Sequence, residues 1–172
     1  MIKDSSGLWD LSLHVYCKLW PFVHSIWYVR FYSKKNFDPC VTYTTLDQPW
    51  RATNSSSISS NCDNSVNWNG WYRLLYNGMN VQMPESCVPA SHCGTDAPLW
   101  ITSAHPQVGD GVVSRTVCGN WNGNCCLFSP PSIQVKACVG NYYVYQFVKT
   151  GVCSLAYCAG NNSFAESFEL FQ

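Results

Sequence analysis

Cysteine is the residue type whose number and spacing could do chemistry in this chain. Eleven cysteines occur among 172 residues, and ten of them lie between Cys40 and Cys158. This density is typical of disulfide scaffolds in oxidising compartments. The adjacent Cys125 and Cys126 cannot easily bond to each other, so we expect their bonds to run in different directions. Cys17 stands apart from the ten and would be a spare thiol or a link to another chain.

Zinc binding is the main alternative use of so many thiols. Structural zinc sites repeat C-x-x-C or pair Cys with His. This sequence contains no C-x-x-C, and the nearest spacing is Cys153 to Cys158. We therefore expect a disulfide framework, with no metal and no cofactor. Ten cysteines allow roughly a thousand complete pairings, so the spacing alone leaves the connectivity open.

Catalysis would need a nucleophile, a base and an orienting group in one cleft. The sequence has no G-x-S-x-G and no H-E-x-x-H. His92 and His105 could act as ligands or bases, but no carboxylate or nucleophile motif accompanies either of them. We therefore predict that the protein is not an enzyme.

The charge composition excludes two classes of partner. Ten basic and ten acidic side chains balance, and charged residues make up only 12% of the chain. The basic patch of a nucleic-acid or membrane-surface binder is therefore missing. Solubility must come from Ser, Asn, Thr and Gly, which suits a secreted glycoprotein. Two N-glycosylation sequons, at Asn54 and Asn161, agree with this interpretation.

The elements that must position these residues are short. From Asp38 onward, extended runs alternate with Gly, Pro, Asn and Ser, which predicts a mainly β domain with long loops. We expect strands after the Asn69-Gly70 turn, at residues 97–101 and at 111–118, and a hairpin pairing 133–137 with 142–148. Gly and Asn dominate residues 118–126, so we expect a loop there. The predicted fold is short antiparallel strands and long loops stapled by about five disulfides.

Residues 1–37 differ from the rest of the chain. Charged residues interrupt every apolar run, so neither a transmembrane span of about 20 residues nor a clear signal peptide fits. We interpret this segment as a gene-model artefact or a degenerate leader. Residues 161–172 would be a tail or the start of a linker, which leaves a module at residues 38–160.

A series of short phrases in this module carries a family resemblance. In chain order they are LDQPWR, NGWYR, MPESCVP, CGTDAPLW, GDGVVSRTVC, NGNCC, IQVKAC, NYYVYQF and CSLAYC. They resemble the cysteine-rich module shared by uromodulin, the pancreatic zymogen-granule membrane glycoprotein and the oncoprotein-induced transcript 3 protein. The resemblance implies an extracellular or secretory-lumen glycoprotein in which this module precedes a zona pellucida module. It also implies five disulfides: Cys40 with Cys138, Cys62 with Cys153, Cys87 with Cys125, Cys93 with Cys158, and Cys118 with Cys126.

The resemblance also suggests a function. In decoy relatives the module displays a high-mannose glycan that captures bacterial fimbrial adhesins. Their sequon lies between Cys138 and Cys153, where this chain has none. We expect adhesion, glycan display or protein interaction, with extracellular proteins or microbial adhesins as partners through N-glycans. The alternative is a lectin-like module using exposed faces of Trp68, Trp71 and Trp121, and a secreted hydrolase is the remote alternative.

Overall fold

The computed structural model describes residues 37–56 and 60–160. The expectations for the first 36 residues, for Cys17, for Asn161 and for the tail lie outside these residues. The described part is mainly β, as predicted, with ten strands and three 3-10 helices, η1 (Pro49–Arg51), η2 (Asp63–Ser65) and η3 (Val108–Asp110).

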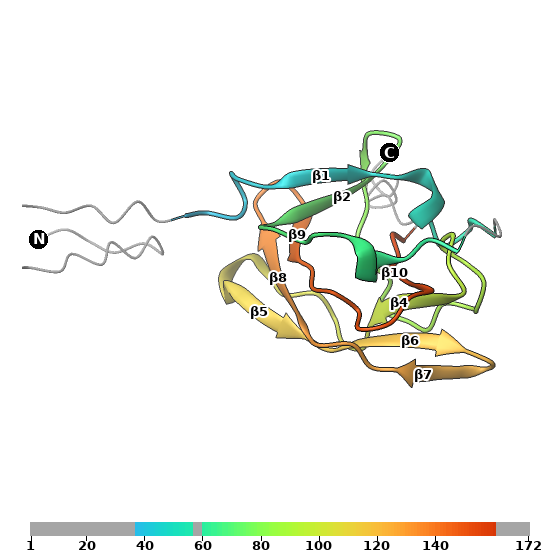
Figure 1. Ribbon diagram of the computed structural model, residues 1–172. Coiled ribbons are helices and arrows are strands. Elements are labelled where there is room, and N and C mark those ends of the chain that lie inside the picture. Colours follow the sequence, from blue (N-terminus) through green and yellow to red (C-terminus); the bar gives the residue numbers. More distant parts are fainter. Residues whose placement is uncertain (1–36, 57–59, 161–172) are drawn as a thin grey trace, which may run out of the picture. The chain divides into compact units, whose positions relative to one another are not determined.

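One sheet contains the predicted hairpin. Its order is β1 (Thr44–Asp47), β2 (Tyr72–Tyr76), β9 (Tyr142–Gln146), β8 (Ile133–Cys138) and β5 (Val112–Arg115), and β3 (Met79–Asn80) pairs with β2 (Figure 1). The hairpin of β8 and β9 is confirmed, with Cys138 opposite Tyr142. Gly140 and Asn141 make its turn with φ values of 98° and 57°. Because β9 lies between two other strands, apolar residues occur on both of its faces.

A second sheet has the order β10 (Leu155–Tyr157), β4 (Ala97–Ile101), β6 (Val117–Trp121) and β7 (Asn124–Phe128). Strand β4 confirms the prediction at residues 97–101. Two of the pairings in the fold are parallel, β1 with β2 and β10 with β4. We expected only antiparallel pairs, because hairpin signals are local whereas both parallel pairs join segments that lie far apart in the chain.

The predicted strand at residues 111–118 is wrong in one respect, because the run forms two strands. Strand β5 pairs with β8 in the first sheet, and β6 pairs with β4 in the second. The chain passes between the sheets at Thr116, whose carbonyl accepts a hydrogen bond of 3.1 Å from the Thr102 N–H. One continuous β-forming run therefore supplies both sheets.

The expected loop at residues 118–126 is also wrong, because β6 and β7 form a hairpin there. Asn122 and Gly123 occupy its turn with φ values of 51° and 76°. Two successive positive φ angles define the type I′ turn that suits a two-residue hairpin connection, and Asn-Gly is the preferred sequence for it. The turn formers thus connect two strands rather than preventing them.

The main core draws on both sheets. Its fully buried members include Leu74, Leu99, Val117, Ile133, Tyr145 and Tyr157. Two smaller clusters lie apart from it, one around Trp71, Cys138 and Val144, the other around Val88, Cys93 and Cys158. Half-cystines are thus part of the hydrophobic packing in both smaller clusters.

Candidate functional site

The disulfide framework positions every surface segment of the described chain. Five bonds join the ten framework cysteines, with Cα–Cα distances from 4.7 to 5.6 Å. These distances fall in the usual range for disulfides. The pairs are Cys40–Cys138, Cys62–Cys153, Cys87–Cys125, Cys93–Cys158 and Cys118–Cys126.

The five bonds differ in the length of chain that they close. Cys40–Cys138 spans 98 residues, whereas Cys118–Cys126 spans 8. In the chain-entropy description, closing a loop of about 100 residues stabilises the fold by up to about 4.7 kcal/mol and closing 8 residues by about 2.5 kcal/mol. The long bonds hold distant segments together, while Cys118–Cys126 fixes one hairpin locally.

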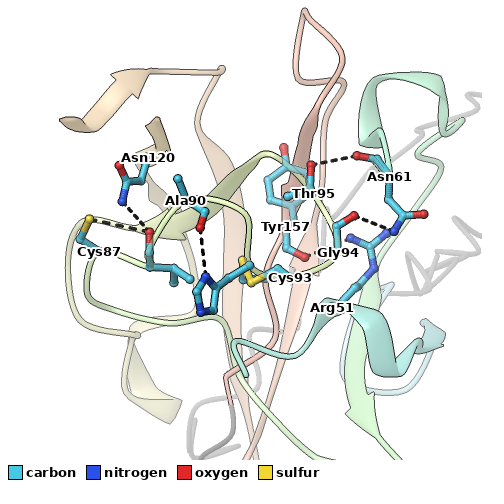
Figure 2. Close-up of a disulfide and its surroundings, with 12 residues drawn as sticks. Arg51, Asn61, Cys87, Ala90, Cys93, Gly94, Thr95, Asn120 and Tyr157 are labelled. Carbon is cyan, nitrogen blue, oxygen red and sulfur yellow. Dashed lines mark hydrogen bonds between the residues drawn. A yellow bond between two sulfur atoms is a disulfide. The ribbon is translucent and has the colours of Figure 1, made fainter. Parts of the chain in front are cut away.

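The Cys93–Cys158 bond lies beside a tightly packed loop (Figure 2). Asn61 donates a side-chain hydrogen bond of 2.8 Å to the Gly94 carbonyl, and Thr95 donates one of 2.9 Å to the Asn61 carbonyl. Gly94 has φ 59°, and a Cβ there would lie 2.8 Å from Nδ2 of Asn61 and 2.9 Å from the Trp50 ring. Only glycine fits this position, so the loop after Cys93 anchors residue 61 closely.

A buried ion pair lies near this loop. Arg51 and Asp63 are only 2% and 1% exposed, and two guanidinium–carboxylate contacts of 2.7 Å join them. Asp63 also accepts a hydrogen bond of 2.8 Å from the Tyr157 N–H. The Arg51 guanidinium lies 4.2 Å from the Trp50 ring centroid, which confirms the predicted cation–π pair. Because both charges are fully hydrogen-bonded, removing one would leave the other buried and unpaired.

The Asn54 sequon lies on the loop between the two residues of this ion pair. Thr53 donates its N–H to the Ala159 carbonyl at 3.0 Å, and Asn61 donates its N–H to the Gly94 carbonyl at 3.0 Å. Between these anchors, Asn54 and Ser56 are exposed. Asn54 is therefore presented on an open loop with a clamped base. Asn161, the second predicted site, lies outside the described residues.

The two histidines that sequence inspection singled out have different surroundings. His105 is buried, and its Nδ1 lies 2.5 Å from Oε1 of Glu85 while its Nε2 lies 2.8 Å from the Tyr145 hydroxyl. The Tyr145 hydroxyl also accepts a hydrogen bond of 3.0 Å from the Met83 N–H. Glu85 was missed because it lies twenty residues before His105 with no motif linking them. His92 only contacts the carbonyl of Ala90, through Nδ1 at 3.1 Å.

The electrostatics of the Glu85–His105–Tyr145 chain favour a neutral imidazole. Burial lowers the pKa of His105, although the Glu85 carboxylate opposes that shift. Burial raises the pKa of Glu85, but the hydrogen bonds from His105 outweigh burial and leave that pKa below its usual value. Burial also raises the pKa of Tyr145, so its hydroxyl keeps its proton and donates to Nε2. Nδ1–H then donates to Glu85, and the arrangement is a buried, fully satisfied structural link.

The tryptophans of the lectin alternative are not all exposed. Trp71 is 8% exposed and packs with Cys138 and Val144, whereas Trp121 is 40% exposed. Trp68 is partly buried and donates its indole N–H to the Asp63 carbonyl at 3.0 Å. The expectation of three exposed aromatic faces is therefore wrong, because two of these side chains complete the core.

Metal binding and membrane insertion were also tested on the described chain. Within residues 37–56 and 60–160, no three His, Cys, Asp or Glu side chains are grouped to hold a metal ion. Across the same ranges, no helix combines the length and hydropathy needed to span a membrane.

Comparison with known proteins places this arrangement among extracellular glycoproteins. A family model for a uromodulin-like cysteine-rich domain matches residues 72–159. The chain is 48% identical over 126 residues to "Pancreatic secretory granule membrane major glycoprotein GP2" of Canis lupus familiaris, covering 73% of this chain and 24% of that protein. It is 45% identical over 126 residues to "Uromodulin" of Rattus norvegicus, covering 73% of this chain and 19% of that protein. The chain thus spans about a quarter or less of the length of these relatives.

Proposed function

Because the chain belongs to the uromodulin-like domain family, we propose that it is a non-enzymatic, disulfide-stapled module that displays an N-linked glycan at Asn54. The protein is located outside the cell or in the lumen of the secretory pathway, as its relatives are. In that compartment an exposed sequon meets the glycosylation machinery. The proposed module spans residues 38–160.

One observation carries this proposal: Asn54 is exposed while the residues that frame its loop are buried. Arg51 and Asp63 close the loop base with their bidentate ion pair. Asn61 is held by Gly94, and Cys62 is bonded to Cys153. A glycan on such a loop would leave from a fixed point on the surface, which limits the ordering entropy lost when a partner binds.

The proposed partners are glycan-binding proteins, either extracellular proteins or microbial adhesins. The family resemblance associates glycan display with the segment between Cys138 and Cys153, which has no sequon here. The Cys62–Cys153 bond ties the end of that segment to the end of the Asn54 loop. We infer that Asn54 provides the display point that the Cys138–Cys153 segment lacks.

Glycopeptide mass spectrometry of the protein secreted from mammalian cells tests the site. We expect glycan on Asn54 and its loss in both Asn54→Gln and Ser56→Ala, with an unchanged thermal midpoint because both side chains are exposed. Binding of a mannose-specific fimbrial adhesin should fall with Asn54→Gln and persist in the matched control Asn161→Gln. Unoccupied Asn54, or adhesin binding equal in wild type and Asn54→Gln, would contradict the proposal.

A further inference from the structure

A groove of about 480 Å³ opens beside Trp68 and has no role in the proposed glycan display. Its size falls in the range of small-ligand sites. Trp68 and Phe147 form its aromatic part. Its polar part comes from Asn67, Ser132, Gln134, Gln146 and Lys149.

The polar side chains of the groove are available to a ligand. Gln134 on β8 lies directly opposite Gln146 on β9 in the sheet. Among the described residues, neither side chain has a hydrogen-bond partner, and the same holds for Asn67 and Lys149. Amide groups beside an aromatic wall suit a sugar ring, since they can pair with hydroxyls while the ring covers apolar surface.

The sequence adds a covalent signal at the same place. Trp68 and Trp71 are the only two of the eight tryptophans that are separated by two residues. Trp-x-x-Trp is the spacing at which transferases of the secretory pathway attach mannose to indole C2 of the first tryptophan. In the folded protein Trp71 is 8% exposed within a core cluster, whereas Trp68 lines the groove.

We propose that Trp68 is C-mannosylated and that the groove beside it holds the attached hexose. The new bond joins indole C2 to the anomeric carbon of mannose. The bond between that carbon and the phosphate oxygen of a lipid-phosphate mannose donor breaks, the lipid phosphate leaves, and C2 loses its proton as the indole regains aromaticity. No oxidant or reductant is involved.

The surroundings of Trp68 fix the ring that carries this hexose. Its indole N–H donates to the Asp63 carbonyl at 3.0 Å, which orients the pyrrole edge containing C2. The rings of Tyr72 and Phe147 meet the indole edge-on, at centroid distances of 4.9 and 5.1 Å. The hexose hydroxyls would pair with the free amides of Gln134 and Gln146. We therefore expect the modified protein to unfold at a higher temperature than the unmodified protein.

Peptide mass spectrometry of the full chain, secreted from mammalian cells behind a cleavable signal, tests the proposal. We expect one hexose on the Trp68 peptide that resists N-glycosidase and fragments across the sugar ring, as a C-linked sugar does. Trp68→Phe should remove it, Trp71→Phe should remove it by breaking the spacing, and Trp121→Phe should retain it. Because N-glycosidase acts only on Asn-linked glycan, this result is independent of Asn54.

A co-expressed Trp-x-x-Trp reference protein reports whether the cells modify that spacing. An unmodified Trp68 in wild-type protein, made alongside a modified reference, overturns the proposal even if the groove binds a free sugar. A hexose found only on another tryptophan overturns it as well. The wild-type measurement decides the question even if Trp71→Phe fails to fold.

Discussion

The hairpins β8–β9 and β6–β7 have similar lengths but are stabilised differently. In β8, Ile133 and Val135 are fully buried and Ala137 nearly so, which gives the strand one continuous core face. In β7, four of the five residues are exposed, including Cys125, Cys126 and Leu127. Burial therefore holds the first hairpin, whereas the Cys118–Cys126 and Cys87–Cys125 bonds hold the second.

This difference shows what disulfides contribute in a small domain. A strand without an apolar face gains little from the hydrophobic effect, because few of its atoms leave water. Restricting the unfolded chain with cross-links stabilises such a strand without burying it. The exposed face of β7 is thus compatible with a defined hairpin.

The largest contrast should come from trimming one aliphatic side chain in each hairpin. Ile133→Ala removes buried methylene groups at a fully buried site, and we expect a loss of about 2 to 5 kcal/mol in the free energy of unfolding. The matched variant Leu127→Ala changes a side chain that is 48% exposed, and its loss should stay within about 0.5 kcal/mol. Denaturant titration measures both. Similar losses at the two positions would remove the distinction.

Removing the local disulfide should give the next largest effect. In Cys118→Ala/Cys126→Ala the unfolded chain regains the freedom of an 8-residue loop, worth about 2.5 kcal/mol. Hydrogen exchange should show faster exchange in β6 and β7 and unchanged protection in β8 and β9. If protection falls equally in both hairpins, the disulfide supports the whole domain and the two regions are not separable.

The smallest effect concerns pH and involves β9 through Tyr145. Since the pKa of His105 is lowered below its usual value of 6.5, its contribution to stability is present above that pH and is lost as the pH falls below it. The pKa of Glu85 is lowered from 4.5, so its contribution is lost as the pH falls below 4.5. Each proton changes the free energy of unfolding by at most about 1.4 kcal/mol per pH unit.

Denaturant titration between pH 7.5 and pH 5 checks this. The free energy of unfolding should decline as the pH falls, and His105→Gln should flatten the decline. The control His92→Gln leaves the buried link intact and should retain the wild-type slope. An equally steep decline in His105→Gln would show that another group sets the pH dependence.

Local sequence signals account for much of the fold. The alternation in residues 133–137 and the Gly140-Asn141 turn predicted β8 and β9, because both signals act between neighbours in the chain. Residues 112–121 mislead for the opposite reason. Their β-forming character is continuous, and only contacts with β8 and β4 assign the two halves to different sheets. Parallel pairing of β1 with β2 is likewise set by the tertiary structure.

The site was less accessible to sequence reasoning. The sequon at Asn54 is a local motif and could be found directly, but its clamped base depends on Asp63 and Gly94, which pair with Arg51 and Asn61 across loops. Glu85 and His105 meet only because their loops pack together. The spacing of ten cysteines left their pairing open, and the family resemblance supplied it.

Peptide mapping under non-reducing conditions tests the central claim most directly. The secreted protein should be digested without reduction and analysed by electron-transfer fragmentation, which separates the partners of the adjacent Cys125 and Cys126. We predict that Cys126 is bonded to Cys118 and Cys125 to Cys87, as in the structure. A bond from Cys125 to any cysteine other than Cys87 would contradict the cross-linked hairpin on which this account rests.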